Sequence, residues 1–252
     1  IFMFYHQNSH FKSLRASHDE VGNKTWVEKD FNELSLFSSR ELFIDESLIN
    51  RKPITKDLEV YALVSGISFE DKFTDALKEI QNQIDLVIGD SLRYWVLPKN
   101  LAVEYCVFKW HDEVWNKSWN DSIVNKIKSI KHESFIFNIY GIQVNQDGCI
   151  IANGYDEGGT LFKIREYMKN ELSFIPKRQS GWAHVPLGRI LEPIGESNFV
   201  KLKNLLNVLK DINVASCEVD SLKFVYEEQW YMEKKNILCD HKLLHNKTKK
   251  IT

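Results

Sequence analysis

The pattern of apolar and polar positions predicts strands and helices in alternation from residue 58 onward. Side chains that alternate between apolar and polar over about four to eight positions are typical of a strand with one buried face. Apolar residues spaced three or four apart indicate the buried face of a helix. By these rules we expect strands at 58–64, 101–108, 135–142, 149–152, 181–190, 217–227 and 234–239, and helices near 73–86, 111–131, 161–172 and 199–212.

The first 56 residues show no such periodicity and are rich in polar side chains. We therefore expect residues 1–56 to form an irregular N-terminal extension that wraps the domain or is partly mobile. The folded domain is expected at 57–240, followed by a lysine-rich tail at 241–252. Within the domain, a strand, a helix and a further strand occur twice, at 58–108 and 135–190. This order predicts a duplicated architecture.

The composition is that of a globular chain in water and changes this picture little. Of the 252 residues, 43% are hydrophobic and 27% are charged, and the formal net charge of -2 gives no general attraction to nucleic acids. No apolar run is long enough to span a bilayer. The four cysteines lie far apart, which favours reduced thiols in a cytoplasmic protein. We expect no metal ion, no cofactor and no membrane partner.

One strand carries the clearest candidate for chemistry. In the segment 181–190, Val185 and Leu187 suit a packed face, whereas His184 and Pro186 point to the opposite one. An imidazole on a strand is held rigidly, which suits proton transfer or contact with a phosphate group. A single histidine on a strand is also commonly an ordinary packed or surface residue, so the motif around it must decide between these interpretations.

The sequence around His184 resembles the second signature of the two-histidine (2H) phosphoesterases, the superfamily that includes RNA 2',3'-cyclic phosphodiesterases and 2'-5' RNA ligases. That signature is His-apolar-Thr/Ser-Leu-small-Arg, and here it is His-Val-Pro-Leu-Gly-Arg, with Pro186 in place of the hydroxyl residue. The first signature, Pro-x-Asn-Leu-His-x-Thr, is similar to the stretch from Pro98 to Glu104. There, Ala102 stands where the first histidine belongs, and Glu104 stands where the first Thr or Ser belongs.

The resemblance covers residues 57–240 and implies both a fold and a function. It implies a bilobal α+β domain in which two antiparallel β-sheets with flanking helices surround a central cleft. Each lobe would contribute one signature strand to that cleft. The cleft would bind a phosphate ester at the end of a nucleotide or an RNA, which would be the partner of this chain. DNA and membranes are not expected as partners.

The substitutions in the signatures predict phosphodiesterase activity that is altered or lost. Opening a cyclic phosphate requires a base on the attacking water and an acid on the leaving oxygen. Two histidines serve well because each changes its charge near neutral pH. Alanine cannot transfer a proton, and a charged Glu104 would repel phosphate. We assign His184 and Glu104 as the candidate catalytic pair; the other interpretation of Glu104 is a carboxylate that only lines the cleft.

Four further residues are candidates for binding the substrate. Arg189, in the second signature, is either a cation in the cleft or the partner of a surface ion pair. Tyr94, Trp182 and Tyr231 offer rings on which bases can stack, although aromatic residues at strand ends more often belong to the core. Three classes of function stay open. They are a divergent cyclic phosphodiesterase (a hydrolase), a non-catalytic binding or scaffold protein on the same fold, and an enzyme for a polar substrate other than a phosphate ester.

Overall fold

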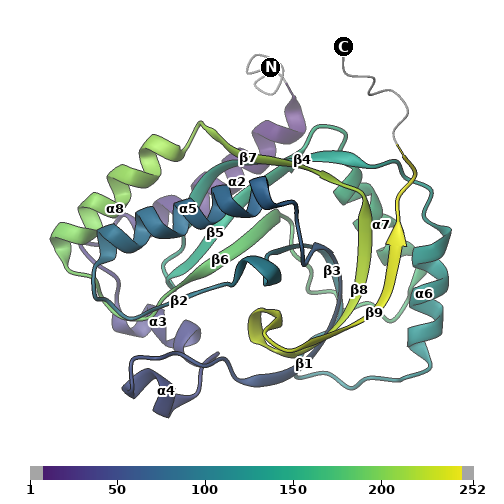
Figure 1. Cartoon of the computed structure of the whole chain (residues 1–252), viewed down its shortest axis with the longest axis horizontal. Coiled ribbons are helices and arrows are strands. Elements are labelled where there is room, and N and C mark those ends of the chain that lie inside the picture. The colour runs from purple at the N-terminus through teal and green to yellow at the C-terminus, as the bar shows by residue number, and fades with distance from the viewer. Residues whose placement is uncertain (1–7, 246–252) are drawn as a thin grey trace.

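Two antiparallel β-sheets form the framework of the computed structural model, which describes residues 8–245 (Figure 1). The four-stranded sheet contains, in spatial order, β3 (Ala102–Lys109), β1 (Asp57–Gly66), β8 (Ser221–Gln229) and β9 (Lys235–Lys242). The five-stranded sheet contains β2 (Arg93–Trp95), β6 (Ala183–Ile190), β5 (Cys149–Asp156), β4 (Phe135–Val144) and β7 (Asn213–Val219). Neighbouring strands run antiparallel in both sheets. The predicted α+β fold with two antiparallel sheets and flanking helices is confirmed.

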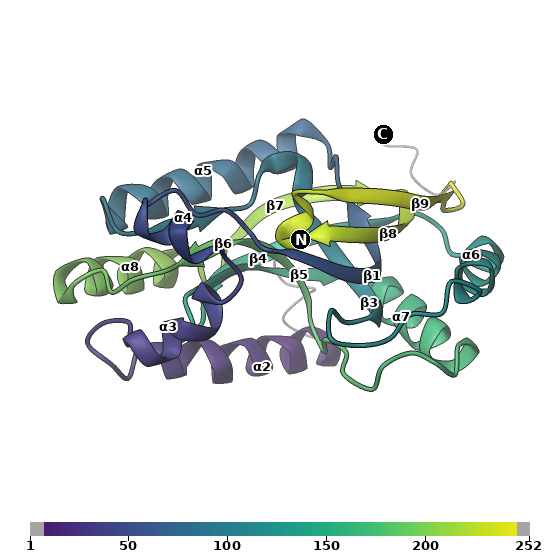
Figure 2. The same cartoon turned by 90° about the horizontal axis from the view of Figure 1, so that it is seen from below.

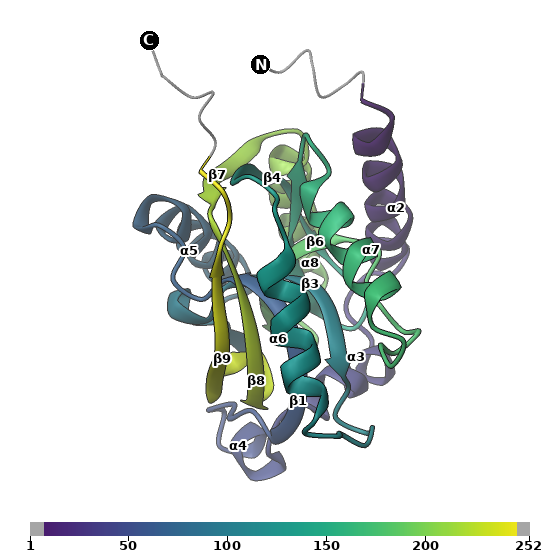
Figure 3. The same cartoon turned by 90° about the vertical axis from the view of Figure 1, so that its right-hand side faces the viewer.

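The helices of the two halves are exchanged between the sheets. The helix α5 (Asp71–Ile88) follows β1 of the four-stranded sheet but contacts β6 and β7 of the five-stranded one, with α8 (Glu196–Leu209) beside it. Conversely, α7 (Thr160–Glu171) follows β5 of the five-stranded sheet but contacts β3 of the four-stranded one, next to α6 (Trp119–Ser129) (Figure 3). The two halves are therefore interlocked, and most of their buried apolar residues form one main core.

Most predicted elements are present, with shifted ends. The strand predicted at 217–227 is the end of β7 and most of β8, which are separated at Asp220. The helix predicted at 111–131 begins only at Trp119. The strand β2 has no counterpart among the predicted strands, because its 3 residues are too few for a periodic pattern. Two 3-10 turns, η1 (Pro98–Asn100) and η2 (Trp230–Met232), precede β3 and β9. Among residues 8–245, no helix is long and apolar enough to cross a membrane.

The N-terminal segment is helical, so the prediction of an irregular extension is wrong for the residues that the structure describes. This segment contains α2 (Ser9–Thr25), α3 (Glu33–Arg40) and α4 (Asp45–Ile49). The buried face of α2 repeats at helical spacing, but His18, Gly22 and Thr25 on that face are not apolar. The apolar pattern is therefore too weak to reveal the helix. Residues 1–7 lie outside the described part of the chain.

The strand β6 presents the two faces that its sequence predicts. Val185, Leu187 and Ile190 are completely buried in the main core. His184 and Pro186 alternate with them along the strand and are only half-buried. The histidine is therefore held on a rigid strand, on the face that points away from the main core.

The N-terminal helices cover the face of the five-stranded sheet that carries this histidine. The helices α2 and α3 lie on the opposite side of the sheet from α5 (Figure 2). Phe11 and Leu14 of α2 pack with Tyr140 and Tyr155 in a small apolar cluster that is separate from the main core. One face of this sheet is thus packed by α5, and the other by α2 and α3 of the N-terminal segment.

Candidate functional site

The two signature strands lie next to each other, and one buried arginine joins them. Arg165 on α7 is 3% exposed. Its guanidinium donates to two backbone carbonyls of β3, those of Glu104 at 3.1 Å and Tyr105 at 2.5 Å. It also donates to the backbone carbonyl of Trp182, just before β6, at 2.7 Å. The strands that match the two signatures are thereby brought to one place, as the resemblance implies.

His184 is the imidazole that remains in the two signatures. Its Nδ1 atom is buried and has no hydrogen-bond partner within the described part of the chain. Burial lowers the pKa of His184 to about 4, and the charges of His18 and Arg165 add to this effect. The imidazole is therefore neutral at pH 7 and is available there as a proton acceptor or a hydrogen-bonding group.

Glu104 is half-buried on β3, two residues beyond Ala102. Ala102 is 6% exposed and packs in a small apolar cluster with Val64. Burial raises the pKa of the Glu104 carboxyl to about 7, although the positive charge of Arg165 opposes the rise. Near neutral pH, Glu104 is thus partly protonated. The negative charge that would repel a phosphate is reduced to the same extent.

A second carboxyl, that of Glu227 on β8, belongs to the same region. The sequence did not predict it as a site residue, because it is only an acidic residue within a strand. It is 9% exposed, and its Oε1 accepts the backbone N–H of Met232 at 2.9 Å. Burial raises the pKa of Glu227 to about 7 against the effect of this hydrogen bond, and the nearby charge of Glu104 contributes to the rise. No group of three or more His, Cys, Asp or Glu side chains within residues 8–245 is placed to hold a metal ion.

Three of the candidate binding residues meet near the other end of β6. The Nε atom of Arg189 donates to the hydroxyl of Tyr231, which lies in the η2 turn. The ring centroids of Tyr231 and Tyr94 are 5.1 Å apart, and the Tyr94 hydroxyl donates to Glu233. Tyr231 has a φ of 60°, a left-handed conformation that is uncommon for a residue with a side chain. The turn thus directs an aromatic ring toward the second signature.

The charge of Arg189 is already paired within the protein. Its Nη1 atom lies 3.0 Å from Oδ2 of Asp147 and also donates to the hydroxyl of Ser39 in α3. The Arg189 side chain is 16% exposed. Of the two interpretations made from the sequence, the ion pair is the one that this geometry supports, and it is half-buried rather than on the surface. A ligand anion would have to compete with Asp147 for this cation.

Trp182 lies beside His184 and is covered by α2. The ring centroids of Trp182 and His184 are 6.1 Å apart in an edge-to-face arrangement. The imidazole of His18 stacks on the indole at 4.3 Å, with 29° between the ring planes. The indole Nε1 donates to the hydroxyl of Ser17 at 2.8 Å. His18 belongs to the segment for which the sequence predicted no structure, so only the fold places it at the site.

The raised pKa of Glu104 predicts a pH-dependent effect of Glu104→Gln on stability. The carboxyl ionises near pH 4.5 when exposed and near pH 7 in the folded chain, so a rise in pH between these values disfavours the folded state. We expect the free energy of unfolding of the variant, relative to the unmodified protein, to increase from pH 4.5 to pH 7 and then to level off. Urea titrations across this range measure the difference, with the exposed Glu157→Gln as the control. A difference that stays constant with pH would contradict the burial effect.

Comparisons with known proteins found matches in structure only. No protein-family model and no curated protein sequence matches this chain. The crystal structure of TT0787 of Thermus thermophilus has a TM-score of 0.54 and 12% identity, covering 74% of this chain and 99% of that one. The apo structure of LigT of E. coli has a TM-score of 0.54 and 8% identity, covering 75% of this chain and 100% of LigT. A crystal structure described as a phosphoesterase has a TM-score of 0.52 and 11% identity, covering 74% and 99%.

LigT has also been solved in complex with phosphate, ATP, NADP+ and 3'-AMP. The matched proteins are covered almost entirely, whereas about a quarter of this chain lies outside each match. At identities of 8% to 12%, these similarities show the fold alone. On that evidence, the chain shares the fold of LigT, of TT0787 and of the phosphoesterase, and this fold agrees with the one that the resemblance of its two signature segments implies.

Proposed function

We propose that this chain is a 2H-phosphoesterase-like protein that binds a phosphate ester at the end of a nucleotide or an RNA, and that its phosphodiesterase activity is altered or lost. The observation that carries the proposal is the placement of His184. This half-buried imidazole, with an unpartnered Nδ1 in the described chain, lies on β6 next to β3, where Ala102 and Glu104 replace the first histidine and the first hydroxyl residue.

The side chains at the site support weakened rather than ordinary chemistry. An in-line opening of a cyclic phosphate needs one group that accepts a proton and another that gives one. His184 is neutral at pH 7 and Glu104 is partly protonated there, which allows His184 to accept a proton and Glu104 to donate one, but a pKa of about 4 makes His184 a weak base. Ala102, in place of the first histidine, cannot transfer a proton, and Pro186 cannot replace the hydrogen bond that a hydroxyl group would give to a phosphate oxygen.

The solved complexes of LigT support the choice of ligand. That protein has the same fold and has been crystallised with inorganic phosphate and with three nucleotides. A nucleotide or an RNA terminus therefore suits the position between β3 and β6 better than a polar substrate without a phosphate.

The four cysteines are free thiols, which supports a cytoplasmic location.

The proposal is tested by incubating the protein with nucleoside 2',3'-cyclic phosphates and by measuring the binding of 3'-AMP. We expect slow or no turnover, and binding of 3'-AMP that weakens roughly tenfold in His184→Ala, because the variant loses one contact to the phosphate ester. The exposed His111→Ala is the matched control and should behave like the unmodified protein.

The outcomes separate the functional classes. Turnover that His184→Ala abolishes would assign a divergent phosphodiesterase. Binding without turnover would assign the alternative, a non-catalytic binding or scaffold protein on the same fold. If a folded protein neither turns over cyclic phosphates nor binds 3'-AMP, the proposed function is refuted.

A further inference from the structure

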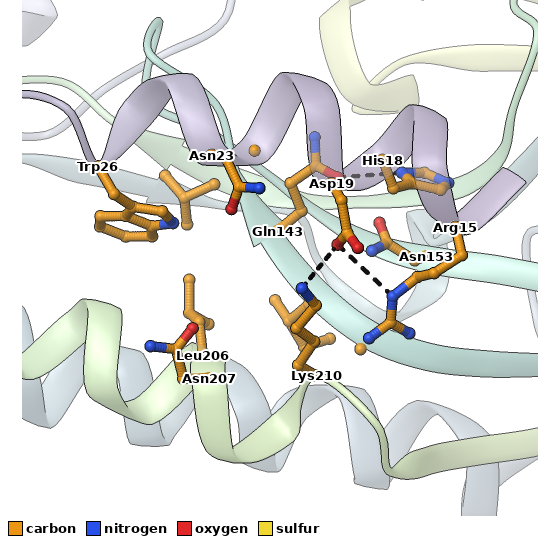
Figure 4. A pocket seen from close by; sticks show the side chains of 14 residues that line it. Arg15, His18, Asp19, Asn23, Trp26, Gln143, Asn153, Leu206, Asn207 and Lys210 are labelled. Carbon is orange, nitrogen blue, oxygen red and sulfur yellow. Dashed lines mark hydrogen bonds and ion pairs between the residues drawn. The ribbon is translucent and has the colours of Figure 1, made fainter.

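The imidazole of His18 is buried between the indole of Trp182 and the carboxamide of Gln143. His18 is 4% exposed and stacks on the indole of Trp182 at 4.3 Å. Its Nδ1 atom is hydrogen-bonded to the side-chain Oε1 of Gln143 on β4 at 3.0 Å (Figure 4). An aromatic face together with a carboxamide is the combination that proteins use to hold a nucleobase, the ring by stacking and the amide by hydrogen bonds to the base edge.

The surroundings of this ring contain polar atoms that α2 does not satisfy. His18 Nε2, Asn153 Oδ1 and His184 Nδ1 are all buried without a hydrogen-bond partner among residues 8–245. Asn153 lies directly opposite His184 in the pairing of β5 with β6. Buried donors and acceptors are normally paired, because leaving one unpaired is costly. Three such atoms, one on the His18 ring and two beside it, indicate that α2 is an imperfect occupant of this surface.

The contact between α2 and the sheet is also hollow. A cavity of about 50 Å³ lies between α2, β4 and the end of α8, and its lining includes His18, Gln143 and Asn153 (Figure 4). A second cavity of about 10 Å³ shares His18 and Asn153. In contrast, α5 on the other side of the sheet buries a mostly apolar face that includes Phe73, Leu77 and Ile84, and the buried Gln81 on it is hydrogen-bonded. The contact of α2 with the sheet is therefore less tightly packed than the contact of α5 with it.

We propose that the face of Trp182, together with Gln143, Asn153 and His184, is a subsite for the heteroaromatic base of a nucleotide, and that His18 occupies it in this structure as an internal substitute. The inference rests on the proposed function, because the base would belong to the nucleotide whose phosphate ester lies near His184. Binding of the nucleotide then requires His18, and α2 with it, to leave the surface.

While His18 occupies the subsite, a ligand can bind only to the fraction of molecules in which the subsite is open. The apparent affinity is reduced in proportion to that fraction. The subsite offers an indole face, two carboxamides and an imidazole, and these groups suit an uncharged ring with both donors and acceptors. The base moiety, rather than the phosphate, is therefore the part of the nucleotide that competes with His18.

The test compares His18→Ala with the unmodified protein in calorimetric titrations with adenosine, 3'-AMP and inorganic phosphate. We expect adenosine and 3'-AMP to bind roughly tenfold more tightly to the variant, because the competing ring is gone, and inorganic phosphate to bind as before. Glu20→Ala, at a mostly exposed position on the same helix, is the control and should change none of the three affinities.

Two additional measurements keep the test decisive. Adding Gln143→Ala or Trp182→Ala to the His18→Ala variant should abolish the gain in adenosine affinity. In the unmodified protein, a saturating concentration of 3'-AMP should increase amide hydrogen exchange in α2. This measurement does not depend on the folding of any variant.

The inference is overturned if adenosine binds a folded His18→Ala variant no more tightly than it binds the unmodified protein, or if α2 stays equally protected at saturating 3'-AMP. That result is distinct from a failure of the proposed function. If only the inference fails, 3'-AMP still binds in a way that depends on His184. If only the proposed function fails, the adenosine effect persists while His184→Ala changes neither the binding nor the turnover of the phosphate esters.

Discussion

Restoring the signature side chains with Ala102→His, Glu104→Thr and Pro186→Thr is expected to raise the hydrolysis of nucleoside 2',3'-cyclic phosphates by roughly 100-fold or more. General acid–base catalysis by one positioned group contributes about 10²–10⁴ to a rate. The triple variant would supply the second imidazole opposite His184 and two hydroxyl groups for the phosphate oxygens. It would also remove the carboxyl that repels the substrate. Initial rates at saturating substrate measure the change.

The control for this gain is the same triple variant with His184→Ala. If the restored reaction uses two imidazoles, removing the native one should return the rate to that of the unmodified protein. Position 102 lies in a small apolar cluster, so the thermal midpoint of each variant must be measured alongside its rate. A folded triple variant with no gain in rate would show that the strands do not place the two signatures in a working geometry.

Removal of the buried arginine between the signature strands has the second large expected effect. We expect Arg165→Ala to lower the free energy of unfolding by about 3 kcal/mol, because it leaves three backbone carbonyls without this donor in a region closed to water. Arg165 as a whole is 3% exposed, so water cannot easily replace its guanidinium. Urea denaturation, followed by far-ultraviolet circular dichroism, measures the change.

The matched control is Lys163→Ala, an exposed position on the same helix, which should change the free energy of unfolding by less than about 0.5 kcal/mol. Arg165→Lys should recover only part of the loss, because one ammonium cannot reach three carbonyls with the geometry of a planar guanidinium. If Arg165→Ala proves as mild as the control, then packing of the strands, and not this arginine, holds β3 and β6 together.

The sequence determined those features that depend on neighbouring residues. The alternation around His184 set the two faces of β6, because side chains on a strand point alternately to opposite sides whatever lies beyond them. The turn before β5 was also determined locally: Gly148 has a φ of 81°, and its N–H bonds to the Asn145 carbonyl at 2.9 Å. Glycine adopts such a conformation without steric cost, so its position marks the turn.

The signature segments predicted the fold correctly because their resemblance to known signatures does not depend on a periodic pattern. They did not predict how the helices are arranged. The exchange of α5 and α7 between the two sheets depends on which apolar face fits which sheet, and a helix has the same amphipathic pattern on either. The local sequence therefore does not show which sheet each helix covers.

The composition of the candidate site was decided by tertiary structure for the same reason. Arg189 meets Asp147 and Ser39 through contacts between residues far apart in the chain, and the charge of Glu104 on β3 raises the pKa of Glu227 on β8. A charged residue in a sequence looks the same whether its partner is water or a buried carboxylate. Only the folded chain settles which of the two it has.

The N-terminal helix is the clearest case of this limit. The buried face of α2 includes a histidine, a glycine and a threonine, so it lacks the apolar stripe by which a helix is recognised. Those side chains fit because β4 offers polar partners: His18 is hydrogen-bonded to Gln143, Gly22 lies against the same side chain, and Thr25 donates to the Val144 carbonyl. The sequence thus determined one rigid imidazole on β6, and the tertiary structure decided that a second imidazole, from α2, lies beside it, because polar contacts across a fold leave no periodic trace along the chain.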